Sequence, residues 1–135
     1  MLLSACAPRT VTPASFDQWR TTDAIRAFQS ANLRFEIPQV SKDERDLFAE
    51  TALESRPFVI PLQGDPSLAR GIIFSFEDES NLFQVQMYYT HLGNALPQFG
   101  SWVFVKDNLL LQINREVPEA VAQKYAQALD LLGEQ

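Results

Sequence analysis

Apolar residues concentrate most strongly between Trp102 and Ile113, in two runs rich in β-branched and aromatic side chains, and this pattern predicts a β-hairpin. Two apolar runs, Trp102 to Val105 and Leu109 to Ile113, flank Asp107-Asn108, whose residue types suit a tight two-residue turn. The cross-strand pairs that this turn implies are Lys106 with Leu109, Phe104 with Leu111 and Trp102 with Ile113. One face of the hairpin is therefore expected to be a wall of large apolar side chains.

The hairpin is followed by a segment with helical spacing. Pro118 suits the first turn of a helix, where its missing amide costs nothing, and Gly133 suits the end. Apolar residues recur at helical spacing between these two positions: Val121, Tyr125, Ala128, Leu129 and Leu132. We expect this stripe to pack on the wall formed by Trp102, Phe104 and Leu111, and this unit to be the nucleus of the core.

The opposite face of the hairpin is also mostly apolar and needs a cover. It carries Val103, Val105, Leu110 and Gln112. The N-terminal region has a matching surplus of apolar side chains, namely Phe16, Trp19, Ile25 and Phe28. A helix is predicted to start near Thr22-Asp23. We expect this first helix, or the segment before it, to cover the second face and to give a monomer with both sheet faces covered.

The middle of the chain contains three further elements. A capping box at Ser41 to Glu44 predicts a surface helix that runs to about Glu54. Phe58 to Ile60 reads as a short edge strand, because Pro57 and Pro61 bound it. Gly71 to Phe76 reads as the next strand, with Ile72, Phe74 and Phe76 on one face and Ile73 and Ser75 on the other.

Residues 79–92 fit two patterns, because their apolar positions both alternate like a strand and recur like a helix. We predict a helix, since Asp78 and Ser80 can cap its start and Gly93-Asn94 can close it. The order strand, acidic link, helix then occurs both in 71–93 and in 109–133, which suggests tandem ββα units. The predicted fold class is α+β, with an antiparallel sheet of about four strands and packed helices.

Composition limits the class of protein. The chain has 135 residues, enough for one core, and its hydrophobic content of 46% is too high for a disordered chain. Its net charge is −6, with basic residues scattered singly. This balance argues against a nucleic-acid partner and against an electrostatic membrane-binding surface. No run of residues approaches the length of a transmembrane helix.

The single cysteine, Cys6, lies in the sequence Leu3-Ser4-Ala5-Cys6. This motif resembles the lipobox of bacterial lipoproteins, in which an aliphatic residue and two small residues precede a cysteine that becomes lipid-modified. Residues 7–15, APRTVTPAS, have the composition of an extended tether. A secretory signal would need an apolar region before the motif, so the resemblance implies a start codon upstream of Met1 or a trimmed chain.

The resemblance implies a domain organisation and a location. Residues 1–15 would be a signal remnant, lipobox and tether, and residues 16–135 a single globular domain. The protein would lie in the bacterial cell envelope, anchored outside the cytoplasmic membrane by a lipid on Cys6. The resemblance extends to small uncharacterised envelope lipoproteins and implies no activity.

Residues for catalysis are scarce. The chain has one His and one Cys, and no CxxC, HExxH, Walker or GxGxxG motif. We therefore predict no catalytic residue, metal site or cofactor. The candidate ligand site is aromatic, because apolar side chains with polar tips gather in sequence around the loop after residue 92. Its members are Tyr88, Tyr89, His91, Phe99 and Trp102.

Two functional hypotheses follow. The first is a lipid-anchored envelope protein that acts as a binding or interaction module, with an envelope protein or a small ligand as its partner. The second is a carboxylate-dependent hydrolase of an envelope polymer, which would use Glu77 and Glu79 with Tyr88 or His91. Core packing also explains Tyr89 and Trp102, and a surface position near a helix end also explains His91.

Overall fold

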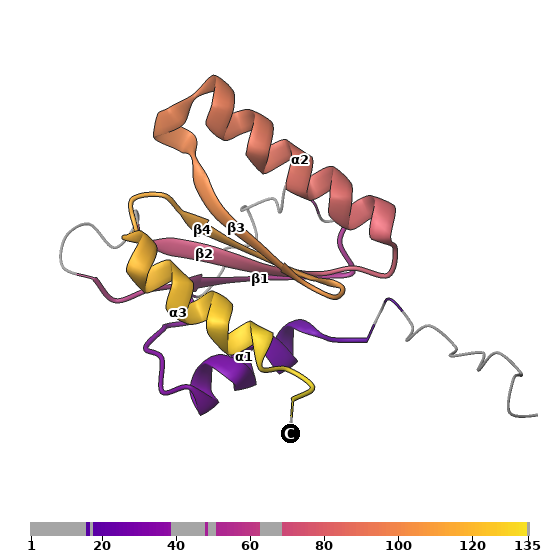
Figure 1. Cartoon of the computed structure of the whole chain (residues 1–135), viewed down its shortest axis with the longest axis vertical. Helices are drawn as coiled ribbons and strands as arrows, with labels where there is room; N and C mark the ends of the chain where they lie inside the picture. Colours follow the sequence, from indigo (N-terminus) through magenta and orange to yellow (C-terminus); the bar gives the residue numbers. More distant parts are fainter. Residues whose placement is uncertain (1–15, 17, 39–47, 49–50, 63–68, 135) are drawn as a thin grey trace, which may run out of the picture.

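The computed structural model describes residues 16, 18–38, 48, 51–62 and 69–134. In this part of the chain four strands form one antiparallel sheet in the order β1-β2-β4-β3, with helices on both of its faces (Figure 1). The elements are α1 (Thr21–Ser30), β1 (Glu54–Val59), β2 (Arg70–Ser75), α2 (Glu79–Ala95), the 3-10 helix η3 (Pro97–Phe99), β3 (Ser101–Lys106), β4 (Leu109–Asn114) and α3 (Glu119–Asp130). The predicted α+β class with a four-stranded antiparallel sheet is confirmed.

The hairpin of β3 and β4 has the predicted register. Lys106 pairs with Leu109, Phe104 with Leu111 and Trp102 with Ile113. Asp107 in the turn adopts a φ of 52°, a conformation that Asp and Asn tolerate better than most residues. The turn residues therefore set the register, and the register decides which face each side chain takes.

One face of the sheet is covered by α1 and α3 together (Figure 1). From α3, Tyr125, Ala128 and Leu129 pack against Leu111 and Ile113, as the sequence predicts. The helix ends at Asp130 with Leu131 as its C-cap, three residues before the predicted Gly133, which has a φ of 83° in the turn that follows. From α1, Ala24, Ile25 and Phe28 join the same cluster. The larger of the two cores thus lies between the sheet and two helices.

The other face is covered by α2, and here the prediction for the N-terminal helix is wrong. Leu82 and Val85 of α2 pack against Phe74, Phe76 and Leu110, with Val103 at the margin of the cluster. Of the four N-terminal apolar side chains expected there, all within the described residues, Phe16 packs with this second cluster. Trp19, Ile25 and Phe28 lie on the α3 side instead. Both faces are covered, but by a different helix from the one expected.

The ββα order occurs twice along the chain, as β1-β2-α2 and as β3-β4-α3. The two inner strands β2 and β4 pair antiparallel. Because these strands are antiparallel, a two-fold axis that exchanged β2 and β4 would have to run perpendicular to the sheet. Such a rotation does not turn the sheet over, so it would place both helices on the same face. Because α2 and α3 lie on opposite faces, the two units share their chain order but are not related by such an axis (Figure 1).

The edge strand β1 is longer than predicted and contains Pro57 within it. The backbone N–H and C=O of Val59 bond Glu36, which lies on the side away from β2. Since alternate residues of a strand point the same way, the position of Pro57 also faces away from β2, and its missing N–H costs no bond of the sheet. The prediction of an edge strand is confirmed.

The helix predicted from Ser41 to about Glu54 lies mostly outside the described residues. Its last part is described and is not helical. The amides of Thr51 and Ala52 both bond the carbonyl of Phe48 in a turn. Glu54 is the first residue of β1, where it pairs with Ser75. The prediction is wrong at this end, because the pairing of β1 with β2 begins four residues earlier than Phe58.

Candidate functional site

The structure does not bring the five predicted ligand-site residues together. Tyr88, Tyr89 and His91 lie on α2, Phe99 ends η3, and Trp102 lies on β3. Trp102 packs with the cluster beneath α1 and α3, on the face opposite to Tyr89. Its indole Nε1 donates to the carbonyl oxygen of Val117 at 2.8 Å, and the Arg115 guanidinium lies 5.2 Å from the centre of its ring.

Tyr88 and His91 also lie away from a common site. The Tyr88 side chain is 39% exposed, and its ring contacts those of Phe48 and Tyr89, with centroid separations of 5.1 and 5.3 Å. His91 is exposed on α2. The alternative reading of His91 as a surface residue near a helix end agrees with its position.

Tyr89 and Phe99 do border a common hollow, of about 410 Å³, at the C-terminal end of α2. The helix contributes Tyr89 and Leu92, and η3 contributes Phe99. From the sheet, Ile72 of β2 lines the hollow beside three polar residues of β3 and β4. The volume falls within the range of about 300–1,000 Å³ that small-ligand sites occupy.

The three polar residues are Ser101, Gln112 and Asn114, and they form a connected row. The side-chain amide nitrogen of Gln112 donates to Oγ of Ser101 at 2.8 Å and to Oδ1 of Asn114 at 3.1 Å. Gln112 is only 5% exposed, so these bonds offset the cost of burying its amide. The row replaces apolar packing at one end of a sheet face that is otherwise apolar.

Local geometry holds the sides of the hollow in place. The amide of Arg115 bonds the carbonyl of Gly100 at 3.1 Å, which ties the start of β3 to the end of β4. A Cβ at Gly100 would lie 2.9 Å from Cδ of Arg115 and 3.1 Å from the carbonyl oxygen of Pro97. A larger residue where η3 meets β3 would therefore require the Arg115 side chain and the Pro97 carbonyl to shift. Pro97 begins η3 and helps to set the position of Phe99.

The sequence contained a signal for this polar row, which the prediction of an aromatic ligand site did not use. Gln112 breaks the apolar character of the face that also carries Val103 and Leu110, and Asn114 continues the same alternation. A buried polar residue is more informative than another aromatic one, because burying it needs partners. Gln98 and Glu116 complete the polar lining of the hollow, and Glu116 is the charged residue among those that line it.

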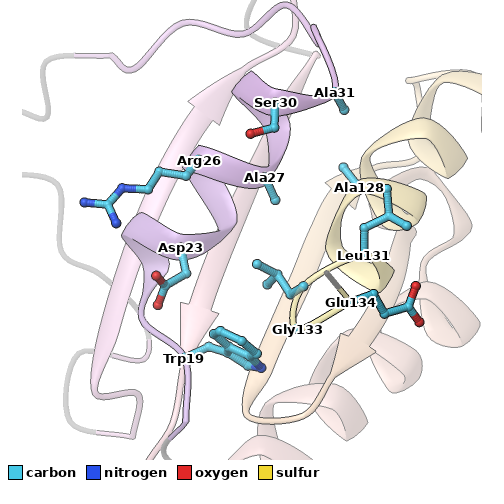
Figure 2. Close-up of a pocket in the computed structure, with 11 residues that line it drawn as sticks. Trp19, Asp23, Arg26, Ala27, Ser30, Ala31, Ala128, Leu131, Gly133 and Glu134 are labelled. Carbon is cyan, nitrogen blue, oxygen red and sulfur yellow. The ribbon is translucent and has the colours of Figure 1, made fainter.

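A second hollow, of about 660 Å³, lies between α1 and α3. Figure 2 shows the side chains of Ala27, Ser30 and Ala31 on one side of this hollow and the side chains of Ala128 and Leu131 on the other. Trp19 closes one end, where its Nε1 donates to Oδ2 of Asp107 at 2.7 Å. This groove is mostly apolar, and Leu131 at its edge is 60% exposed.

The residues of the hydrolase hypothesis do not form a cleft. Glu77, Glu79 and His91 are all exposed. Glu79 and His91 are twelve residues apart on α2, which corresponds to about 18 Å along the helix axis. Asp78 between the two glutamates caps the helix, since its Oδ1 accepts from the Ser80 amide at 2.8 Å. No group of three or more potential metal ligands occurs in the described part of the chain.

Cys6 and the tether lie outside the described residues. Within the described ranges, no helix is both long enough and apolar enough to cross a bilayer. No protein-family model matches the chain, and no curated protein or solved structure matches it significantly.

Proposed function

We propose that this chain is a lipid-anchored protein of the bacterial cell envelope that acts as a binding module. The observation that carries the proposal is the motif Leu3-Ser4-Ala5-Cys6, which precedes nine residues of tether composition and then a folded domain. Acylation of Cys6 would join that domain to a membrane. A lipid anchor on one end leaves the remainder of the chain free to present a binding surface.

The tether limits how far the domain lies from the lipid. Residues 7–15 separate Cys6 from Phe16, the first described residue of the domain. Fully extended, the ten steps from Cys6 to Phe16 span at most about 36 Å, at roughly 3.3–3.6 Å per residue. Phe16 packs with the cluster beneath α2, so α2 and the hollow at its end belong to a domain held close to the membrane surface.

The hollow at the end of α2 supports the binding role. It combines apolar residues from the helix and sheet with a hydrogen-bonded polar row, and small-ligand sites share this composition. The exposed positions of Glu77, Glu79 and His91 give no comparable support to the hydrolase hypothesis. The proposed activity is therefore binding.

The test is the mass of the N-terminal peptide of the protein purified from bacterial membranes, expressed with its natural upstream sequence. A processed lipoprotein begins at Cys6 and carries a thioether-linked diacylglyceryl group. Under the proposal this modified peptide is the main species, and the Cys6→Ser variant yields none of it. An unmodified peptide that contains the free thiol of Cys6 would refute the anchor.

A further inference from the structure

We propose that the hollow at the end of α2 binds a neutral saccharide unit through the Ser101–Gln112–Asn114 row and the aromatic ring of Phe99. The inference rests on the proposed binding function but does not require the lipid on Cys6. It names the chemical class of the ligand, which follows from three properties of the lining: its fixed hydrogen-bonding groups, its exposed ring and its charge.

The polar row offers both donors and acceptors in fixed positions. Both N–H groups of Gln112 are used within the row, so the amide oxygens supply acceptors and the Ser101 hydroxyl supplies a donor. The bonds from Gln112 to Ser101 and Asn114 hold these side chains relative to one another before a ligand arrives. Such preorganisation lowers the entropy lost on binding. Sugar hydroxyls also donate and accept, so adjacent hydroxyls of a pyranose ring match a row of this kind.

Phe99 supplies the apolar part of the site. Its side chain is 57% exposed although it borders the hollow, and an exposed aromatic ring is available for contact with a ligand. A pyranose ring presents C–H groups on its faces beside its hydroxyls, and these groups pack against aromatic rings. Tyr89 and Leu92 contribute further apolar contact from α2. The lining therefore has one polar part and one apolar part, as a sugar has.

Charge selects against anionic ligands. Among the residues that the structure describes, those that line the hollow include Glu116 and no Lys or Arg. The guanidinium of Arg115 lies 5.2 Å from the centre of the Trp102 ring, and the Arg115 side chain also lies beside Gly100 at the edge of the hollow. The whole chain has a net charge of −6. The Glu116 carboxylate would repel a phosphate or carboxylate group placed beside it, whereas it can accept a hydrogen bond from a neutral sugar.

The test is a titration of the ¹⁵N-labelled 135-residue chain, followed by amide chemical shifts in NMR. The probes are the neutral disaccharides cellobiose, maltose and N,N′-diacetylchitobiose at millimolar concentrations, with glucose 6-phosphate as the anionic comparator. We expect at least one neutral disaccharide to shift the backbone amides of Ser101 and Gln112 and the side-chain amide of Gln98. Glucose 6-phosphate should shift these amides less at the same concentration.

Two exposed phenylalanines provide a matched pair of variants. Phe99→Ala removes the ring at the hollow, and we expect at least about tenfold weaker binding, equivalent to about 1.4 kcal/mol. Phe83→Ala removes a ring that is 58% exposed on α2 but does not line the hollow, and it should bind as the unmodified chain does. The spectra themselves show whether each variant is folded.

Three results would overturn the inference: no shift with any neutral disaccharide, equal losses in both phenylalanine variants, or stronger binding of glucose 6-phosphate. None of these results depends on Cys6, so none of them would refute the proposed lipid anchor. Conversely, an unmodified Cys6 would refute the anchor and would leave a saccharide titration unaffected.

Discussion

Asn108 joins three parts of the chain through one side chain. Its Oδ1 accepts from the amide of Trp19 at 2.9 Å, and its Nδ2 donates to the carbonyls of Trp19 and Phe76 at 2.8 and 3.0 Å. The residue is fully buried in the turn between β3 and β4. The turn residue that the sequence singled out for its backbone conformation therefore also fixes the N-terminal segment and the end of β2.

Replacement of Asn108 by Ala should be strongly destabilising. It would leave three backbone groups without their partner, and each unsatisfied buried group costs about 1–3 kcal/mol. We expect the free energy of unfolding, measured by urea denaturation, to fall by at least about 3 kcal/mol. The control is Asp107→Asn, which keeps at position 107 a residue type that tolerates the positive φ found there. Equal stability of the two variants would contradict this role for Asn108.

Tyr125 should give the protein a dependence on alkaline pH. Burial raises the pKa of Tyr125, and its hydroxyl donates to the carbonyl of Arg34. Above the ordinary tyrosine pKa of about 10, the unfolded chain loses this proton first, so stability should fall as pH rises through the raised pKa of the folded state. Tyr125→Phe should cost about 1 kcal/mol at neutral pH and should reduce this alkaline loss.

The measurement is urea denaturation from pH 7 to pH 11. Tyr88→Phe is the control, because Tyr88 is a more exposed tyrosine on α2 and the substitution makes the same chemical change. An alkaline loss of the same size in Tyr125→Phe and in the unmodified chain would exclude Tyr125 as its source.

At the scale of elements, α2 was predictable from its N-terminal cap rather than from its periodicity. Its apolar residues do not keep to one side, since Phe83 is exposed while Leu82 and Val85 are buried. Asp78 marks the start, as the sequence indicates. The predicted end at Gly93-Asn94 is wrong, because the helix continues to Ala95, where Leu96 and then Pro97 follow. Pro97 disfavours a helical backbone at the residue before it.

The cap of α2 yields a second pH prediction. Hydrogen bonds from the hydroxyl and the backbone amide of Ser80 hold the pKa of Asp78 below its ordinary value. A carboxyl with a lowered folded-state pKa stabilises above its unfolded pKa, and that stability is lost as pH falls through the lowered value. Asp78→Asn should retain the cap but lose this dependence, whereas Asp78→Ala should lower the melting temperature at neutral pH.

Circular dichroism melts between pH 2 and pH 7 would measure both effects. The contribution of Asp78 is the difference between the unmodified chain and Asp78→Asn at each pH. Melting temperatures of the Ala and Asn variants that agree throughout would show that the cap does not stabilise α2.

The assignment of helices to sheet faces could not be predicted from sequence. Both faces of the hairpin are apolar, and both α1 and α2 have apolar residues to bury, so the pattern fits either arrangement. Contacts distant in sequence decide it. Glu54, which pairs with Ser75, accepts hydrogen bonds from the Thr21 amide and the Ser75 hydroxyl through Oε1, both at 3.1 Å. This carboxylate holds the start of α1 on the α3 side.

The ligand site was also predictable only in part, because residues that are close in sequence need not lie on the same face of the sheet. Sequence proximity placed Tyr89, Phe99 and Trp102 together, but Trp102 and Tyr89 extend to opposite faces of the sheet. The polar row required the register of β3 with β4, which pairs Ser101 with Asn114 and Val103 with Gln112. The hairpin turn predicts that register, so the pair Ser101 and Asn114 was within reach of the sequence.

At the scale of the whole molecule, the sheet lies between α2 on one side and α1 with α3 on the other (Figure 1). The N-terminal segment reaches both sides, because Phe16 packs beneath α2 and Trp19 packs on the α3 side. The tether that we propose for residues 7–15 would therefore join a segment whose side chains pack in both clusters.

The partitioning of the full-length protein from bacterial cells into detergent tests the central claim most directly. With its natural upstream sequence, the unmodified protein should enter the detergent phase, and the Cys6→Ser variant should stay in the aqueous phase, because the acyl chains supply most of the membrane affinity. Melting curves of the two purified proteins should agree, which would show that the domain is intact. Equal partitioning of the two proteins between the phases would contradict the lipid anchor at Cys6.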